Sequence, residues 1–191
     1  MKLVATEVKT VDTWEEVVAS LKTLEFRPEF LLEEVPAPAR LAPKSFALGL
    51  DVVGSNDEDL ANGRFVVLHD PEGQETWNGT LRIVTFVSAP IETDVVTDEL
   101  FDDVAWSWLM DSLSSSLDGF HNISGTVTRT VSKSFAGIEN REREADVEIR
   151  ASWTPNTSNV GEQLKVWLDF VEQCAGLTPL PPGVSTISRN R

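Results

Sequence analysis

The sequence predicts an α+β domain in which three helices pack on an antiparallel sheet of about five to six strands. Helix-like and strand-like segments follow one another in the order helix, four to five strands, helix, two strands, helix. The strands are joined mainly by short turns and not by helical crossovers. This arrangement is typical of antiparallel pairing with helices on the sheet.

The length of 191 residues fits one globular domain spanning 1–191, whose ends at 1–10 and 185–191 we expect to be flexible. Area scaling indicates that about 70% of the unfolded chain's surface can be buried, which suffices for a core without disulfides. The single cysteine, Cys174, in any case excludes an intramolecular disulfide.

The first helix is predicted from a capping box in which Thr13 and Glu16 have the required spacing. Pro28 bounds it. Its apolar stripe comprises Trp14, Val17, Val18 and Leu21. A short apolar run at 30–32 follows, and then an extended connector at 35–43 that contains three prolines, which a central strand does not accept.

Three longer strands are predicted at 46–52, 63–70 and 80–88. The first alternates apolar and small or polar residues. The other two are apolar on both faces, which is typical of central strands covered on both sides. We expect the second of these strands to end in a turn at 70–73, where Asp-Pro-Glu-Gly has favourable turn chemistry.

The second helix is predicted over 97–117, with Thr97 or Asp98 as its cap and Gly119 at its exit. Acidic residues at its start suit the positive end of the helix dipole. On a helical wheel, the apolar residues of this predicted helix cover a broader arc than the single stripe that a surface helix turns to its core. Its centre, at Phe101, Ala105 and Trp108, is expected to face the sheet.

A hairpin follows, with strands at 125–135 and 145–153 and two registers open to it. One register places Arg129 and Lys133 opposite Glu148 and Glu144. The other turns the row of Thr126, Thr128, Thr130 and Ser132 outward. The last helix is predicted to begin near Asn159 and to end before Gly176, with the stripe Leu164, Trp167, Leu168, Val171 and Ala175.

The charge balance of the chain disfavours certain classes of binding partner. With 31 acidic and 16 basic residues the net charge is −15, which disfavours direct binding of nucleic acid or of anionic membranes. Between Phe65 and Thr128 there are eleven acids and one base, Arg82. The N-terminus lacks a signal peptide and no apolar run is long enough to span a membrane, so a cytoplasmic location is expected.

Catalytic motifs are missing. The chain has no P-loop, no dinucleotide-binding glycine fingerprint, no HExxH, no CxxC and no GxSxG. His69 beside Asp70 could orient a general base, although the same residues suit a turn. Carboxylates at Asp94, Asp98, Glu99, Asp102 and Asp103 could bind a divalent cation, although acids are expected at a helix start. We predict no metal, haem or other cofactor.

Several strings in the chain carry a resemblance to a known family. They are FRPE, LEEVPAPARLAP, NGRFVVLHDPEGQETWNGTLRIVTFV, WSWL, GTVTRTVSKSF, VEIRASWTP and AGLTPLPPGV, between Phe26 and Val184. Together and in this order they resemble an uncharacterised actinobacterial family known only as a domain of unknown function. The resemblance implies no activity and no catalytic residues. The order of elements is also similar to that of small acidic dimeric chaperones of the type III secretion class.

These observations lead to two alternative hypotheses about the function of the protein. The first is a non-enzymatic, acidic adaptor or chaperone-like protein that binds a protein partner or a second copy of itself. The alternative is an enzyme or small-ligand binder with a pocket lined by carboxylates and His69. For the first, the predicted interface is a flank of the second helix with its acidic rim: Trp106, Met110, Leu113, Leu117, Asp102 and Asp103.

Overall fold

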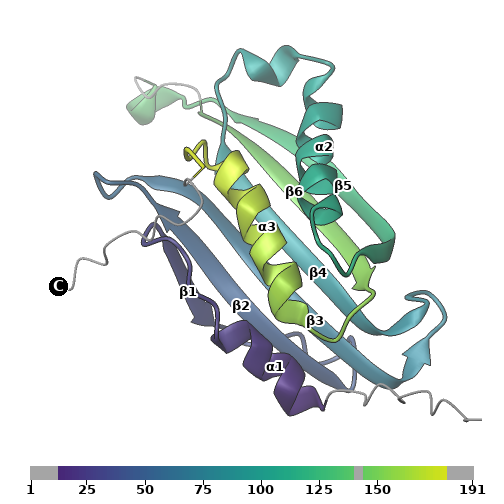
Figure 1. The fold of residues 1–191 in the computed structure, drawn as a ribbon. Coiled ribbons are helices and arrows are strands. Elements are labelled where there is room, and N and C mark those ends of the chain that lie inside the picture. The colour runs from purple at the N-terminus through teal and green to yellow at the C-terminus, as the bar shows by residue number, and fades with distance from the viewer. Residues whose placement is uncertain (1–12, 140–143, 180–191) are drawn as a thin grey trace, which may run out of the picture.

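The computed structural model describes residues 13–139 and 144–179 and shows an α+β fold with one antiparallel sheet (Figure 1). The predicted ends at 1–10 and 185–191 lie outside the described residues. The elements are α1 (Trp14–Lys22), β1 (Phe30–Glu34), β2 (Lys44–Val53), β3 (Asp59–Gln74), β4 (Gly79–Pro90), a 3₁₀ turn (Val95–Thr97), α2 (Phe101–Ser114), β5 (Phe120–Ser132), a 3₁₀ turn (Ala136–Ile138), β6 (Glu144–Pro155) and α3 (Val160–Cys174).

The six strands lie in the order β1-β2-β3-β4-β6-β5, and every neighbouring pair is antiparallel. The predicted fold class is therefore confirmed. The two strands that are apolar on both faces, β3 and β4, occupy the middle of the sheet as expected. They are central because each pairs with a strand on both sides over most of its length.

The three helices pack on one face of the sheet, with α3 across its middle and α2 over β5 and β6 (Figure 1). The main core lies between these layers. Its largest fully buried side chains include Phe65, Trp153, Trp167 and Phe170. Inside it Gln163 accepts a hydrogen bond from Trp153 Nε1 at 2.8 Å and donates one to Ser116 Oγ at 3.1 Å.

The first and last helices follow their sequence signals. The capping box forms at Thr13, whose hydroxyl accepts from the Glu16 amide while the Glu16 carboxylate accepts from the Thr13 amide. Helix α3 ends before Gly176, which has a φ of +65°. Both predicted boundaries are confirmed because local side-chain and backbone chemistry determines them.

Several predicted boundaries are wrong, among them the end of α2, which comes at Ser114 and not at Leu117. Strand β3 does not end at Asp70 but continues to Gln74, and the turn comes at residues 75–78, where Asn78 has a φ of +54°. Helix α2 begins at Phe101 and not at 97, because a separate 3₁₀ turn occupies Val95–Thr97. Neither Thr97 nor Asp98 is its N-cap residue, although Asp98 does accept a hydrogen bond from the Leu100 amide.

The hairpin adopts the register in which the threonine row faces away from the helices. Thr128 lies opposite Glu148, while Arg129 lies opposite Val147. Arg129 therefore points to the helix side, where it forms an ion pair of 2.9 Å with Asp102 and donates to the carbonyl of Val96. The charge pairs of the other register, between Arg129 and Glu148 and between Lys133 and Glu144, do not form.

Candidate functional site

The face of the sheet opposite the helices is only partly covered by the described residues. The connector between β1 and β2 crosses one side of it and forms a small second core. Its apolar residues Val35, Ala37 and Ala42 pack against Ala47, Val66, Leu68 and Trp77. The prediction that β3 and β4 are covered on both sides therefore holds only for part of this face, which we call the outer face.

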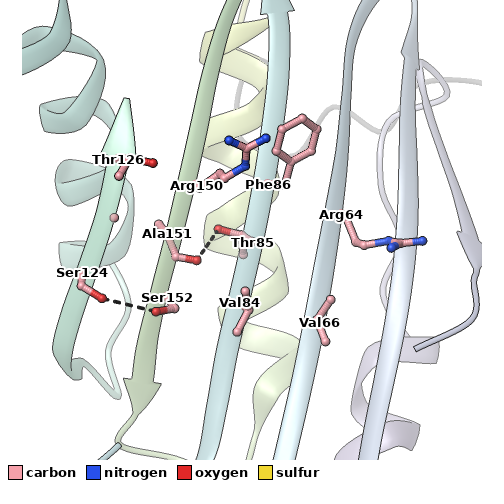
Figure 2. A pocket seen from close by; sticks show the side chains of 11 residues that line it. Arg64, Val66, Val84, Thr85, Phe86, Ser124, Thr126, Arg150, Ala151 and Ser152 are labelled. Atoms are coloured by element: carbon pink, nitrogen blue, oxygen red, sulfur yellow. Dashed lines mark hydrogen bonds between the residues drawn. The ribbon is translucent and has the colours of Figure 1, made fainter. Parts of the chain in front are cut away.

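Beside the connector, the outer face holds a shallow groove of about 520 Å³ (Figure 2). Side chains from the neighbouring strands β3, β4, β6 and β5 line it. The lining residues are Arg64, Val66, Val84, Thr85, Phe86, Ser124, Gly125, Thr126, Arg150, Ala151 and Ser152. Strand pairing brings these residues together from positions that are up to 88 apart in the sequence.

One row of the groove combines two arginines with an aromatic ring. Strand register places Arg64 beside Phe86, Phe86 beside Arg150 and Arg150 beside Thr126. The Arg150 guanidinium lies 5.2 Å from the centre of the Phe86 ring and forms an ion pair of 2.8 Å with Glu148. Arg64 is exposed and makes no ion pair with any residue that the structure describes. The row is therefore apolar in the middle, with Arg64 on one side and Arg150, paired with Glu148, on the other.

The next row of the groove contains Ser124 and Ser152, and a buried arginine, Arg82, contacts both of them. Arg82 is only 7% exposed, and its Nη1 and Nη2 atoms donate to uncharged oxygens alone. The acceptors are the carbonyls of Asn122 and Ser152 and the hydroxyls of Ser124, Ser152 and Thr154, at 2.7 to 3.5 Å. Burial lowers the pKa of Arg82, but an arginine remains charged in proteins. No carboxylate among the described residues neutralises it.

This arrangement prepares two groove hydroxyls to bind an anion. Ser152 Oγ accepts a hydrogen bond from Arg82 at 2.7 Å, and Ser124 Oγ contacts the same guanidinium. The two hydroxyls also share a hydrogen bond of 3.4 Å, in which one is the donor, so the hydrogen of the other can be donated into the groove. A positive charge behind this pair of hydroxyls favours a carboxylate or phosphate over a neutral group.

The groove is suited to binding and not to acid–base chemistry. Its described lining contains no histidine, cysteine or carboxylate. A serine nucleophile would need a base within hydrogen-bond reach, and the partner of both serines is a cation. Sequence reasoning missed this groove, although Arg82 stands out as the single base among the eleven acids between Phe65 and Thr128.

The predicted interface residues do not form one surface. Leu113 is fully buried, and Leu117, beyond the end of α2, is 97% exposed. The buried side of α2 comprises Phe101, Ala105, Leu109 and Leu113. The predicted Trp108 is partly buried against the same core, with its ring edge-on to that of Phe101 at 6.2 Å between ring centres.

The remaining members of the predicted interface lie over β5. Asp102 pairs with Arg129, and the Trp106 ring lies against the backbone of Gly125. Met110 is half-buried and Asp103 is exposed. These four residues follow one side of α2, and for them the interface remains a prediction.

The two histidines of the chain line one cavity of about 390 Å³ at the end of the sheet near the start of α3. His69 stacks on Trp14 at 5.6 Å between ring centres, and its buried Nδ1 atom has no hydrogen-bond partner in the described part of the chain. Burial and the nearby Lys44 lower the pKa of His69. His121 forms hydrogen bonds with Asn156 and with the carbonyl of Asn78. The described residues that line this cavity include no carboxylate.

The other candidates from the sequence form no site in the described part of the chain. Among residues 13–139 and 144–179, no group of three His, Cys, Asp or Glu side chains could hold a metal ion, and this includes the acids around Asp98. Cys174 is half-buried, and burial raises the pKa of its thiol to about 12. Such a thiol is a poor nucleophile.

Comparisons with known proteins identify the family and no activity. No curated protein and no solved structure matches the chain significantly. Within the described residues, no helix is long and apolar enough to cross a membrane. Residues 10–185 match the family model described as Protein of unknown function (DUF3000), so the chain belongs to the DUF3000 family.

Proposed function

We propose that the protein is a non-enzymatic binding protein that holds a segment of a protein partner in the groove on its outer face. A carboxylate of the partner is received by the Ser124 and Ser152 hydroxyls, and an apolar side chain next to it lies over Val84 and Phe86. The observation that carries this proposal is the buried charge of Arg82 behind a groove without catalytic groups.

The charge of the whole chain and the charge of the groove have different roles in this proposal. A net charge of −15 repels an acidic partner at long range and slows association. At contact, the local arginines and hydroxyls decide which segment binds, because local complementarity sets specificity. The cytoplasm is the compartment in which we expect this binding to occur.

The test is selection of peptides from a random display library on the immobilised protein, with Arg64→Glu as the groove variant. Arg64 is exposed and has no ion pair among residues 13–139 and 144–179, so the variant should fold normally. Lys165→Glu is the matched control, since Lys165 is exposed on α3 and thus on the other side of the sheet. We expect selected peptides to combine Asp or Glu with apolar residues and to lose binding to Arg64→Glu only. No enrichment, or equal loss in both variants, contradicts the proposal.

A second candidate function is binding of a small ligand in the cavity that His69 and His121 share. It is favoured by the buried Nδ1 atom of His69, which lacks a partner and could bond to a ligand. The test is a fragment screen observed by NMR of the imidazole signals, repeated with His69→Phe, which keeps a ring against Trp14. Fragments that shift the His69 signals and do not bind the variant support this function, and the absence of such fragments contradicts it.

A further inference from the structure

One edge of the sheet is a long strand whose outer side has no partner among the residues that the structure describes. Strand β5 has 13 residues and pairs only with β6. Its register is irregular between His121 and Ser124 and regular from Ser124 to Ser132. That regular stretch is about 30 Å long, at the usual rise per residue of a strand. Its outer backbone groups are therefore available to pair with another strand.

The usual protection of such an edge is missing from β5. Exposed edges of monomeric proteins commonly carry proline or charged side chains, especially lysine. Residues 120–132 contain no proline, no lysine and no acid, in a chain with 31 acids. The only charged residue, Arg129, points to the helix side and pairs with Asp102. The opposite edge differs, because β1 has only five residues and ends in Glu33 and Glu34.

The side chains of β5 on the outer face of the sheet are compatible with those of a second β5 strand. They are Ser124, Thr126, Thr128, Thr130 and Ser132. In an antiparallel pair of two β5 strands related by a twofold axis, hydroxyl residues face hydroxyl residues. Threonine pairs across strands are favourable, and no like charges meet although each chain is strongly acidic.

Helix α2 adds apolar surface above the same strand. The Trp106 ring presses on Gly125, and Met110 follows one helical turn later on the same side of α2. In a twofold arrangement, each copy would place this side of α2 over the junction of the two strands. Aromatic residues and methionine are enriched in the cores of such interfaces.

We propose that a second copy of this chain pairs with the edge of β5 in antiparallel orientation, so that one continuous sheet runs through both copies. The proposal rests on the strand edge and not on the groove. Thr128 and Thr130 belong to the edge and do not line the groove, so the two proposals can fail separately.

The first test is sedimentation velocity over a range of protein concentrations, with the double variant Thr128→Lys, Thr130→Lys. These side chains are exposed and lie opposite Glu148 and Asp146 of β6, so the variant should fold. We expect the wild type to form dimers and the variant to remain monomeric with an unchanged circular dichroism spectrum.

The matched control is Thr23→Lys, Thr178→Lys, which adds the same charge at two exposed threonines outside the sheet and should leave the dimer intact. A wild type that stays monomeric, or a dimer that persists in the edge variant, overturns the proposal.

The second test locates the contact. Single cysteines are placed at Thr126, Thr128 or Thr130 in a Cys174→Ser background, and disulfide formation between copies is measured. Because a disulfide needs Cβ atoms about 4 Å apart, only positions near the twofold axis should cross-link efficiently. A cysteine at Thr178 is the control. Dimers that cross-link no better through β5 than through the control overturn the proposal.

Discussion

Both faces of the sheet carry aromatic side chains, but the two faces differ in how far these side chains are buried. On the helix-covered face, Phe65, Ile83 and Trp153 are 0% exposed. On the outer face the same strands carry Phe86 and Arg150, which stay partly accessible beside the groove. The difference shows that apolar residues on both sides of a strand do not imply cover on both sides. Here one face stabilises the fold, and part of the other remains available for binding.

The largest expected difference between the faces concerns two phenylalanines on neighbouring strands. Phe65→Ala should lower the free energy of unfolding by about 3–5 kcal/mol, because it leaves a cavity in the closed core. Phe86→Ala should cost less than half as much, since water can fill the space. Urea unfolding of both variants measures this. Equal losses would mean that the outer face is as structural as the covered one.

A second comparison uses two glycines. A Cβ atom at Gly125 would lie 2.6 Å from the Trp106 ring and 2.3 Å from the Arg150 carbonyl, whereas at Gly137 it would meet nothing within 4 Å. Gly125→Ala should destabilise the protein by about 1–3 kcal/mol and displace Trp106. Gly137→Ala should change little. Thermal unfolding and tryptophan fluorescence test this, and similar behaviour of the two variants would contradict the contact.

The core under the helices also contains a hydrogen-bond network around the buried side chain of Gln163. Gln163→Leu would leave the buried Nε1 of Trp153 without an acceptor, at a cost of about 1–3 kcal/mol. Gln173→Leu, at an exposed position of the same helix, is the control and should be close to neutral. Chemical denaturation should separate the two variants. If Gln163→Leu is neutral, the network does not stabilise the core.

The smallest expected effect depends on pH. Because burial and Lys44 lower the pKa of His69 below its ordinary value of 6.5, the unfolded chain binds this proton more tightly than the folded protein. Stability should therefore fall as the pH drops from above 6.5 toward the lower folded pKa. Urea midpoints at about pH 7.5 and about pH 5.5 should differ less in His69→Gln than in the wild type. An identical difference in both proteins would contradict this assignment.

Local signals in the sequence predicted the helices and the central strands well. The capping box at Thr13 and the glycine after α3 are determined by neighbouring residues. The prediction failed at Asp70, where the turn signal corresponds to an irregularity in the pairing of β3 with β4 between His69 and Gln74 and the strand continues to Gln74. Asp70 accepts hydrogen bonds from Glu72 and Gln74 in this irregular stretch. The prediction also failed at the start of α2, where a 3₁₀ turn ends at Thr97 and the helix begins only at Phe101.

The groove could not be predicted from the sequence because it depends on register across four strands. Arg82 and Ser152 are 70 residues apart, and only the pairing of β4 with β6 brings them together. The hairpin had two possible registers, and the one that forms turns Thr126 to the groove and Arg129 to the helices. For the α2 flank, the burial of Leu113 depends on packing between helices, which the periodicity of one helix does not reveal.

The central claim is that the outer face binds an anion next to an apolar group. The most direct measurement is an NMR titration with phenylbutyrate and, as the matched probe, phenylbutylamine, which differs in the sign of its charge. The account predicts that the carboxylate shifts the amide signals of Ser124, Thr126 and Ser152 while the amine does not, and that Arg64→Glu weakens the effect. Shifts of equal size with both probes, or shifts confined to other parts of the protein, would contradict it.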